Sequence, residues 1–313
     1  MSGLWNELGK KLAEQWLSLL VLPGALYVAV TVIAVTLGHT HALDLGLLVR
    51  QITAQAKNPA VTNASGQIVV LLAVLAAAAA VGLVAQGIGA FVERAVLATG
   101  WRAWPRPLAA VTSTWVHRRQ ARWDKAHNRF RHQYQAALAP DPADRPDPAA
   151  RHRAAHARSR IAVERPERPT WSGDRVHAAA LRLDRDHHLD LATVWPFTWL
   201  VLPSETQADI TRTRTAITRA ATLAGWAVLY LALSSRWWPA APLAVVLTFT
   251  ARHRLRSGID SYATLLEVTT RAYATTLAAQ LGIGHTGPLT PQLGGTLTQQ
   301  LRHSGPPHPP EPA

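Results

Sequence analysis

Two long apolar runs restrict what this chain can fold into. Residues 17–37 carry no charged side chain, and residues 68–92 carry only Gln86 as a strongly polar one. Because an α-helix rises about 1.5 Å per residue, each run is long enough to cross the hydrocarbon core of a bilayer, which is roughly 30 Å thick. We therefore expect an integral membrane protein with a transmembrane helix at each run.

The first run is predicted to be a retained membrane anchor. It is longer than the apolar core of a secretory signal peptide, which spans about 7–15 residues, and Thr40-His41-Ala42 is a poor cleavage site. Residues 1–16 precede this run and have Leu at every fourth position from 4 to 12. This spacing predicts an amphipathic helix on the cytoplasmic surface of the membrane.

A third apolar region predicts a short hairpin. Residues 216–235 form its first arm, with Arg219 at the base, and residues 236–251 lead back toward a cluster of arginines. The second arm either crosses the membrane or re-enters it, and we favour two short spans because re-entrant backbone must be covered by protein. The expected fold class is all-α: an integral membrane helical protein with four transmembrane segments, two long ones plus the hairpin, and a helical cytoplasmic region.

The distribution of basic residues predicts the sidedness of the chain. Residues 38–67 hold only Arg50 and Lys57, whereas residues 93–215 hold 21 Lys and Arg against 13 Asp and Glu. Because cytoplasmic loops are enriched in Lys and Arg, we expect residues 38–67 outside the cytoplasm and both termini inside it. An Arg-, Ala- and Pro-rich composition is typical of a high-GC bacterial genome, which indicates a multi-pass protein of a bacterial cytoplasmic membrane.

Tryptophans stand next to the predicted ends of the spans. Indole prefers the headgroup region of a bilayer because its ring is apolar while its N–H needs a hydrogen-bond partner. The tryptophans expected at the membrane interface are Trp5, Trp16, Trp101, Trp104, Trp237 and Trp238.

One face of the second span is rich in small residues, which let helix backbones approach closely in lipid. An i+4 row and a further pair of small residues make up this predicted helix-packing face: Ala78, Gly82, Gln86 and Ala90, with Ala85 and Gly89. The face either packs against the protein's own first or third span or joins copies of the chain into a homo-oligomer. The sequence leaves both alternatives open.

The region 93–215 is expected to be basic, helical and cytoplasmic, with a Pro- and Asp-rich linker at 139–150. Residues 108–138 form a helix whose apolar stripe is interrupted by arginines. Residues 189–203 are apolar and aromatic, and Pro196 is expected to break their helix. We expect this segment to rest at the membrane interface or to close the cytoplasmic mouth of the helix bundle.

The C-terminal part is predicted to be one helix followed by a tail. Residues 252–281 have an apolar seam that packs on the protein's own cytoplasmic helices or on a second chain. Residues 282–313 are expected to be disordered. The Gly-x-Gly-x-x-Gly run at 282–287 matches a dinucleotide-binding fingerprint by letter. It follows a helix rather than a strand, and Pro288 and Pro291 are expected to prevent the phosphate-binding helix.

Few residues in the chain suggest chemistry. The absence of Cys excludes disulfides and thiolate metal sites, and we expect no cofactor. Carboxylate and imidazole side chains spaced four apart suit a divalent ion, although the same residues beside Arg182 and Arg185 also form ordinary salt bridges. These weak metal-site candidates are Asp184, Asp186, His187, His188 and Asp190.

The same part of the chain carries a resemblance. Residues 164–203 contain Pro169-Thr170 and Gly173, then a helix, then Trp195-Pro196. In this order they resemble a segment of a loose group of bacterial, actinobacterial-type multi-span membrane proteins of unknown activity. The group has Asn where Asp174 stands and Tyr-Gly where His187-His188 stand. The resemblance implies that this segment is the functional cytoplasmic module, and it implies no particular reaction.

Three functions remain open from the sequence. We favour a non-enzymatic membrane scaffold or signalled membrane effector with a cytoplasmic docking surface, since catalytic motifs are lacking. The alternatives are a homo-oligomeric channel lined by the second spans and a membrane enzyme that uses the 184–190 cluster. The formal net charge of +13 indicates anionic lipid headgroups of the bilayer as partners, with a cytoplasmic protein as a further partner, rather than nucleic acid.

Overall fold

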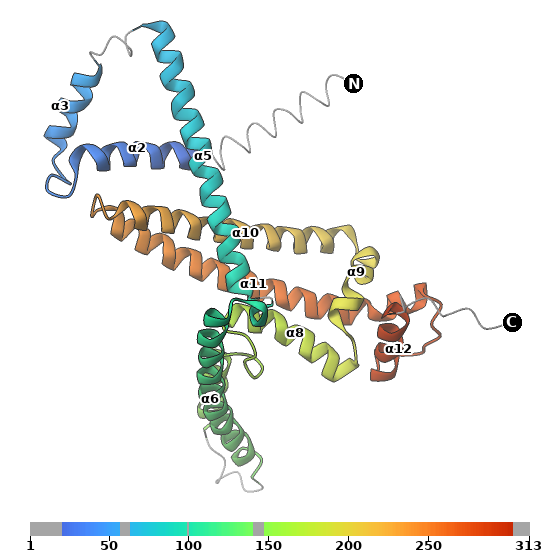
Figure 1. The fold of residues 1–313 in the computed structure, drawn as a ribbon. Coiled ribbons are helices and arrows are strands. Elements are labelled where there is room, and N and C mark those ends of the chain that lie inside the picture. Colours follow the sequence, from blue (N-terminus) through green and yellow to red (C-terminus); the bar gives the residue numbers. More distant parts are fainter. Residues whose placement is uncertain (1–20, 57–62, 99, 140–146, 303–313) are drawn as a thin grey trace, which may run out of the picture. The chain divides into compact units, whose positions relative to one another are not determined.

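A computed structural model of the chain describes residues 21–56, 63–98, 100–139 and 147–302 (Figure 1). The predicted helix at 1–16, with Trp5 and Trp16, lies outside these residues. Every regular element in the described ranges is a helix, which confirms the all-α prediction for them. The elements are α2 (Leu22–Leu37), α3 (Leu45–Ala56), α5 (Ala64–Leu97), η2 (Trp101–Ala103), α6 (Arg106–Ala136), α7 (Pro148–Ser159), α8 (Trp171–His187), α9 (Leu191–Val201), α10 (Ser204–Leu233), α11 (Ala240–Gln280) and α12 (Pro291–Arg302).

The chain divides into two compact units, which are described separately. The apolar unit comprises Met1–Glu93 and Thr218–Leu255, and the basic unit comprises Arg94–Ile217 and Arg256–Ala313. Each of the long helices α5, α10 and α11 contributes residues to both units.

Among the residues that the structure describes, two helices are long and apolar enough to cross a membrane, α5 from Ser65 to Leu97 and α10 from Ser204 to Leu233. Only 17% of the most apolar window of α5 is buried inside the protein, against 44% for α10. A helix that is apolar on all sides is either buried in a protein core or surrounded by lipid. Because so little of α5 is buried, it does not have the burial of a soluble core helix. Four spans are not confirmed, because described helix α2 has only 16 residues.

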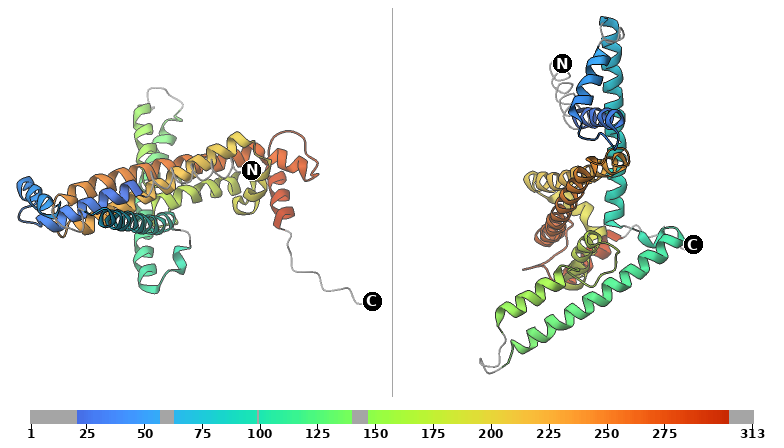
Figure 2. Two further views of the ribbon diagram at one scale, coloured as in Figure 1. Left: turned by 90° about the horizontal axis from the view of Figure 1, so that it is seen from above. Right: turned by 90° about the vertical axis from the view of Figure 1, so that its left-hand side faces the viewer.

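In the apolar unit, α2 lies alongside the α10–α11 hairpin, and α5 crosses these helices steeply (Figures 1 and 2). Tyr27 of α2 packs its ring against Trp226 and Tyr230 of α10 and donates a hydrogen bond from its hydroxyl to the Leu229 carbonyl at 3.2 Å. The buried core between the three helices comprises Ala34, Tyr230, Leu233, Ala240 and Ala244. The arrangement therefore differs from a bundle in which all helices run alongside one another.

The small residues of α5 make contacts within the chain, which is one of the two alternatives left open above. A Cβ on Gly24 of α2 would overlap the carbonyl of Ala78, and a Cβ on Gly225 of α10 would overlap that of Ala85. A Cβ on Gly89 would come within 2.8 Å of the Thr222 backbone. The backbones of α2 and α10 are thus in direct contact with the backbone of α5 at these glycines. The buried positions are Ala78, Gly82, Ala85 and Gly89, whereas Gln86 and Ala90 are exposed.

The helical geometry explains which of these positions are buried. A strict i+4 row turns by about 40° at each step, because successive residues are about 100° apart around the helix. The predicted row through Gln86 and Ala90 therefore turns away from α2 and α10. Alternating steps of four and three keep Gly82, Ala85 and Gly89 on the face that starts at Ala78.

The hairpin continues beyond the residues expected for it. α10 begins at Ser204, in the region predicted to be cytoplasmic. α11 joins the predicted second arm, 236–251, and the predicted helix 252–281 into one helix of 41 residues. No proline follows Pro242 in α11, so nothing interrupts its backbone hydrogen bonds.

The basic unit has a core where α8, α9, α11 and α12 meet. Leu183 and Leu189 at the end of α8 are fully buried, as are Val194 of α9 and Leu297 of α12. α9 stays helical through Pro196, contrary to the predicted break, and the Asp190 side chain caps its N-terminus. α6 and α7 pack side by side as a second hairpin (Figure 2).

The predicted disorder of the tail is wrong for residues 291–302, which form α12. Pro291 stands at the first helical turn, where its missing N–H costs nothing, and the Thr290 hydroxyl accepts a hydrogen bond from the Leu293 N–H at 3.3 Å. The expectation that Pro291 prevents a helix is therefore also wrong. Leu293 and Leu297 lie one turn apart and fill the core, which provides the driving force for folding this short helix. Residues 303–313 lie outside the described part.

Candidate docking platform

Asp174, in the first turn of α8, is the centre of a buried polar cluster. Its carboxylate lies 2.6 Å from the Arg119 guanidinium of α6, with side chains only 5% and 10% exposed. It also accepts hydrogen bonds from the backbone N–H groups of Glu167 and Arg168, at 2.9 and 2.8 Å. Burial raises the pKa of Asp174, and Arg119 and the two N–H groups act in the opposite direction.

Arg119 holds the loop that leads into α8. Beyond Asp174 it donates to the carbonyls of Ile161 and Arg168, at 2.8 and 2.5 Å. Trp123, one turn later on α6, donates to the Ala162 carbonyl at 3.0 Å. The residues of α6 that are buried are Val116, Arg119 and Trp123. The arginine that seemed to interrupt an apolar stripe is thus part of the buried face. We call α6, residues 160–170 and α8 the platform.

The platform also caps the end of α5. Thr170 donates from its hydroxyl to the Val96 carbonyl at 2.5 Å and accepts from the Gly173 N–H as N-cap of α8. Arg168 donates to the Leu97 carbonyl at 3.3 Å. A side chain on Gly173 would overlap that same Leu97 carbonyl. Carbonyls at a helix C-terminus lack partners within the helix, so these contacts satisfy groups that α5 itself cannot.

A second set of contacts ties α8 to α11. Arg175, whose side chain is 8% exposed, pairs with Asp260 at 2.5 Å and donates to the Thr264 hydroxyl at 2.8 Å. The Arg256 guanidinium lies over the Trp171 ring, 4.3 Å from its centroid. α8 is therefore held on α6 by Asp174 and on α11 by Arg175.

The predicted metal-site candidates do not gather around one point. In the described ranges, no three His, Asp or Glu side chains are placed to hold a metal ion. Asp186 pairs with Arg185 at 2.9 Å and Arg271 at 3.7 Å, and Asp190 pairs with Arg302 at 2.8 Å. Asp190 also caps α9. The pKa values of Asp186 and Asp190 are lowered, chiefly by these arginine hydrogen bonds.

The other candidates have structural positions at the end of α8. His188 has a left-handed backbone (φ 53°) and donates its N–H to the Asp184 carbonyl at 2.8 Å, as in a C-terminal helix cap. Glycine suits such a residue best, because it adopts a left-handed backbone without steric cost. The Nδ1 atom of His187 is buried without a hydrogen-bond partner in the described structure. Burial lowers the pKa of His187, and the positive charge of Arg271 adds to this effect.

The predicted module residues fall into two separate places. Thr170 and Gly173 belong to the platform and form its contact with α5, and Pro169 precedes them in the loop. Trp195 and Pro196 lie on α9, where Trp195 packs against the core of the basic unit and Pro196 is exposed.

The predicted interface tryptophans also differ from one another. Trp237 is half-buried in the apolar unit and donates its indole N–H to the Ala42 carbonyl at 2.9 Å, while Trp238 is 47% exposed. Trp101 donates to the Glu167 carbonyl at 3.2 Å, and Trp104 is half-buried. Trp237 and Trp101 therefore hold loops as well as standing near predicted span ends.

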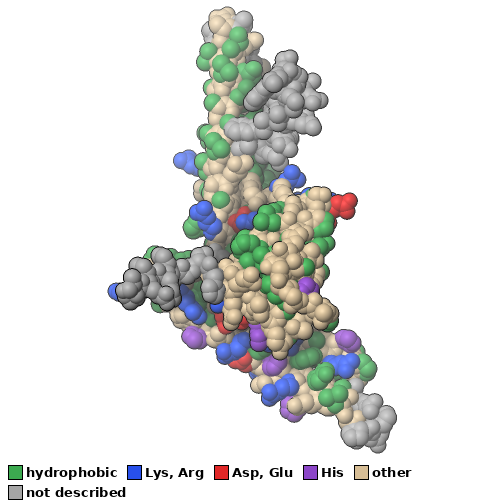
Figure 3. All heavy atoms as spheres, turned by 90° about the vertical axis from the view of Figure 1, so that its right-hand side faces the viewer, with side chains coloured by type: hydrophobic (Ala, Val, Ile, Leu, Met, Phe, Trp, Pro, Cys, Tyr) green, Lys and Arg blue, Asp and Glu red, His purple; other side chains and the backbone are tan. Residues whose placement is uncertain are grey.

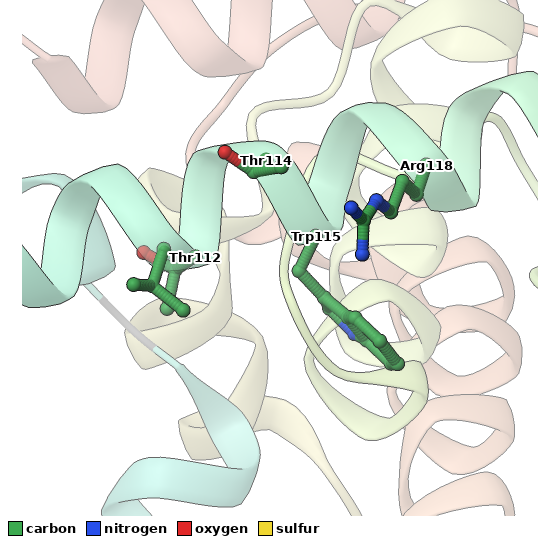
Figure 4. Close-up of a pocket in the computed structure, with 5 residues that line it drawn as sticks. Thr112, Thr114, Trp115 and Arg118 are labelled. Carbon is green, nitrogen blue, oxygen red and sulfur yellow. The ribbon is translucent and has the colours of Figure 1, made fainter.

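Basic side chains gather on the α6–α7 hairpin, whereas hydrophobic ones cover much of α5 (Figure 3). Residues 106–139 and 147–160 hold eleven Lys and Arg against Asp124 and Asp147. A shallow depression on α6 is lined by Val111, Thr112, Thr114, Trp115 and Arg118 (Figure 4). Trp115 and Arg118 project from the same side of the helix (Figure 4). A second depression is lined by α11 alone. Neither resembles a catalytic cleft, because each is lined by a single helix.

Four charged residues that are buried in the described part of the chain escaped the sequence reasoning. Arg119, Asp174 and Arg175 read as ordinary charges of exposed helix faces. Glu93, the last residue of its segment in the apolar unit, is 8% exposed and accepts a hydrogen bond from Thr218 at 3.3 Å. One usable signal was the 3-4 spacing of Val116, Arg119 and Trp123, which places an arginine in line with two apolar residues.

The chain was compared with protein-family models, curated proteins and solved structures, and nothing matches it.

Proposed function

We propose that this protein is a non-enzymatic, membrane-anchored docking protein. The apolar unit is the anchor, and the basic unit presents surfaces to partners on the cytoplasmic side. The observation that carries the proposal is the cap on α5, in which Thr170 and Arg168 bond the last carbonyls of a helix suited to span a bilayer. A platform fixed to the end of such a helix is held at the membrane.

The buried charges of the platform support a docking role over an enzymatic one. Arg119, Asp174 and Arg175 form ion pairs and hydrogen bonds that hold helices and loops together. Catalytic groups need an open site that a substrate can enter. Among the residues of the enzyme alternative, Asp186 and Asp190 are held in ion pairs with arginines, and His188 forms the C-terminal cap of α8.

The exposed apolar surface of α9 is the proposed site for a cytoplasmic protein partner. Leu200 is 77% exposed and Phe197 38% exposed, on a helix that carries no charged residue. Aromatic and uncharged surfaces are typical of the centres of protein interfaces. We infer that this surface, rather than the cationic α6, binds protein.

The test uses the tagged full chain, purified from its own membranes in mild detergent with its native mass measured. Wild type is expected to retain a stoichiometric protein partner, and Leu200→Glu is expected to lose it. The matched control is Thr211→Glu, at an exposed polar position of α10. Leu243→Glu would not serve, because a charge in the apolar unit changes insertion into the membrane. A partner-free chain, or equal loss in both variants, would contradict the docking proposal.

The proposed topology has four membrane segments, at 17–37, 68–92, 216–235 and 236–251, with both termini in the cytoplasm. The absence of Cys makes a clean test possible. Single cysteines at exposed Leu43 and at exposed Arg131 would be treated with a membrane-impermeant maleimide on intact cells. Labelling at 43 and protection at 131 are expected, and the opposite pattern would reject the orientation.

A homo-oligomeric channel is the second candidate, because one observation favours it. Gln86 is exposed on α5, away from the packed face, where a second copy of the chain can meet it. A polar side chain on an apolar helix favours contact with protein or water over lipid. Gln86→Leu would abolish conductance and oligomer formation in reconstituted vesicles if this candidate holds. A monomeric native mass for wild type would exclude it.

A further inference from the structure

One face of α6 carries an exposed stripe of apolar and then cationic residues. Its spacing alternates between three and four, which keeps every member on one side of the helix. The stripe consists of Leu108, Val111, Trp115, Arg118, Arg122, Lys125 and Arg129.

The stripe has little packing of its own. Leu108, Val111 and Trp115 are 54%, 69% and 52% exposed. The four cations that follow are exposed as well, and none forms a salt bridge with an acidic side chain in the part of the chain that the structure describes. Asp124, the acidic residue of α6, is paired with Arg165 instead.

We propose that this stripe docks α6 on the surface of an anionic bilayer. The cations bind lipid phosphates, and the apolar residues enter the region beneath the headgroups. Trp115 stands where the apolar part meets the cationic part, and indole prefers such a boundary because it has an apolar ring and a polar N–H. The inference rests on the proposed function only for the anchoring of the apolar unit in a bilayer.

Charge and shape favour a lipid surface over a protein partner. From 108 to 129 the stripe is about 32 Å long at 1.5 Å per residue, and it is straight. Unpaired cations along more than half of that length complement a flat anionic surface. A protein interface of ordinary size has an apolar, aromatic centre from which charged residues are depleted. Only three side chains at one end of the stripe fit that description.

Position in the chain favours the same occupant. α5 is one of the two described helices suited to span a bilayer, and it ends at Leu97. α6 begins nine residues later, at Arg106. The connecting residues can span roughly 3.5 Å each at most. The apolar end of the stripe, at Leu108, is the end nearer to α5 along the chain. A short tether raises the local concentration of lipid surface around the stripe.

The experiment uses the full chain with one introduced cysteine, reconstituted in phosphatidylcholine vesicles with or without phosphatidylglycerol. Val111→Cys carries an environment-sensitive fluorophore, and spin-labelled lipids quench it. His117→Cys, exposed on the other side of α6, is the matched control. Quenching at 111 is expected to exceed that at 117, and only when phosphatidylglycerol is present.

A charge-matched pair of triple variants tests the cations. Changing Arg118, Arg122 and Lys125 to Gln is expected to lower the ratio of attached to detached α6 roughly a hundredfold, from about fivefold per cation. Changing Arg131, Arg153 and Arg160 to Gln removes the same charge from exposed positions off the stripe. This second variant is expected to keep the quenching at 111.

The outcomes separate the possible failures. If the chain does not float with vesicles, the proposed anchoring fails. If it floats but 111 and 117 are quenched alike, or both triple variants act alike, the stripe is not a lipid-docking face. Quenching at 111 that is lost only when a purified partner protein is added would show that protein competes for the stripe, and would overturn the choice of lipid as its occupant.

Discussion

The guanidinium of Arg119 lies 2.6 Å from the carboxylate of Asp174, and both side chains are almost fully buried. The two residues come from α6 and α8, which are separated along the chain by α7 and two loops. Their ion pair, with the loop carbonyls that Arg119 also bonds, joins these elements into the platform.

Asp174→Asn is expected to loosen the platform, because Arg119 then keeps a buried charge with no opposite charge beside it. Losing one partner of a buried pair costs about 3–5 kcal/mol. Hydrogen exchange at the Glu167 and Arg168 amides, which bond Asp174, would report the change. Asp124→Asn breaks an exposed pair and is expected to leave exchange unchanged. Equal effects of the two variants would refute the central role of Asp174.

Gly294→Ala is expected to displace α12, since its Cβ would overlap the His187 carbonyl. Overpacking of this kind costs about 1–3 kcal/mol. Gly295→Ala is the control, because its Cβ would come no nearer than 3.9 Å to the His188 Cβ. Alanine there favours the helix by about 0.5–1 kcal/mol. Exchange rates across α12 in the two variants should therefore move in opposite directions.

Gly89→Ala is expected to weaken the apolar unit in the same way. The new methyl group would meet the Ala221 and Thr222 backbone of α10, at a cost of about 1–3 kcal/mol. Nothing lies within 4 Å of a Cβ at Gly87, so Gly87→Ala on the same helix should leave the melting temperature in detergent unchanged or higher. A similar drop in melting temperature for both variants would indicate that alanine destabilises α5 in general, and would contradict a close crossing at Gly89.

Acidification is expected to loosen the junction of α8 and α12 through His187. Burial lowers the pKa of His187, Arg271 adds to this, and Asp186 opposes it. A histidine with a lowered folded pKa stabilises the fold fully above its ordinary pKa, which is about 6.5, and loses that contribution as the pH falls below it. By this mechanism, the protease sensitivity of α12 should rise as the pH is lowered from about 7.5 to about 5.5, a range that brackets the ordinary pKa of histidine.

His187→Gln provides the control for the pH dependence. The variant keeps a polar side chain but does not titrate, so its protease sensitivity should stay level over the same pH range. The Asp190–Arg302 pair contributes nothing to that range. The lowered pKa of Asp190 puts its loss of stability below about pH 5, where free Asp, with a pKa of about 3.9, begins to protonate. A pH dependence that persists in the variant would remove His187 as its cause.

The sequence by itself determined that this chain is helical and that it holds helices able to cross a membrane. Both properties follow from local patterns: an uncharged run of sufficient length and apolar residues at helical spacing. It also located the small residues of α5. It could not rank Gln86 below Ala85, because that ranking depends on which neighbouring helix crosses α5 and at which turn.

Only the tertiary structure decided the roles of Arg119, Asp174 and α12. A charged residue reads as exposed until a partner far along the chain is placed beside it, and Asp174 lies 55 residues from Arg119. Likewise, a helix of 12 residues among Gly and Pro has too few internal hydrogen bonds to form alone. It folds because Leu293 and Leu297 bury themselves against α8 and α9, and contacts of that kind leave no local pattern to read.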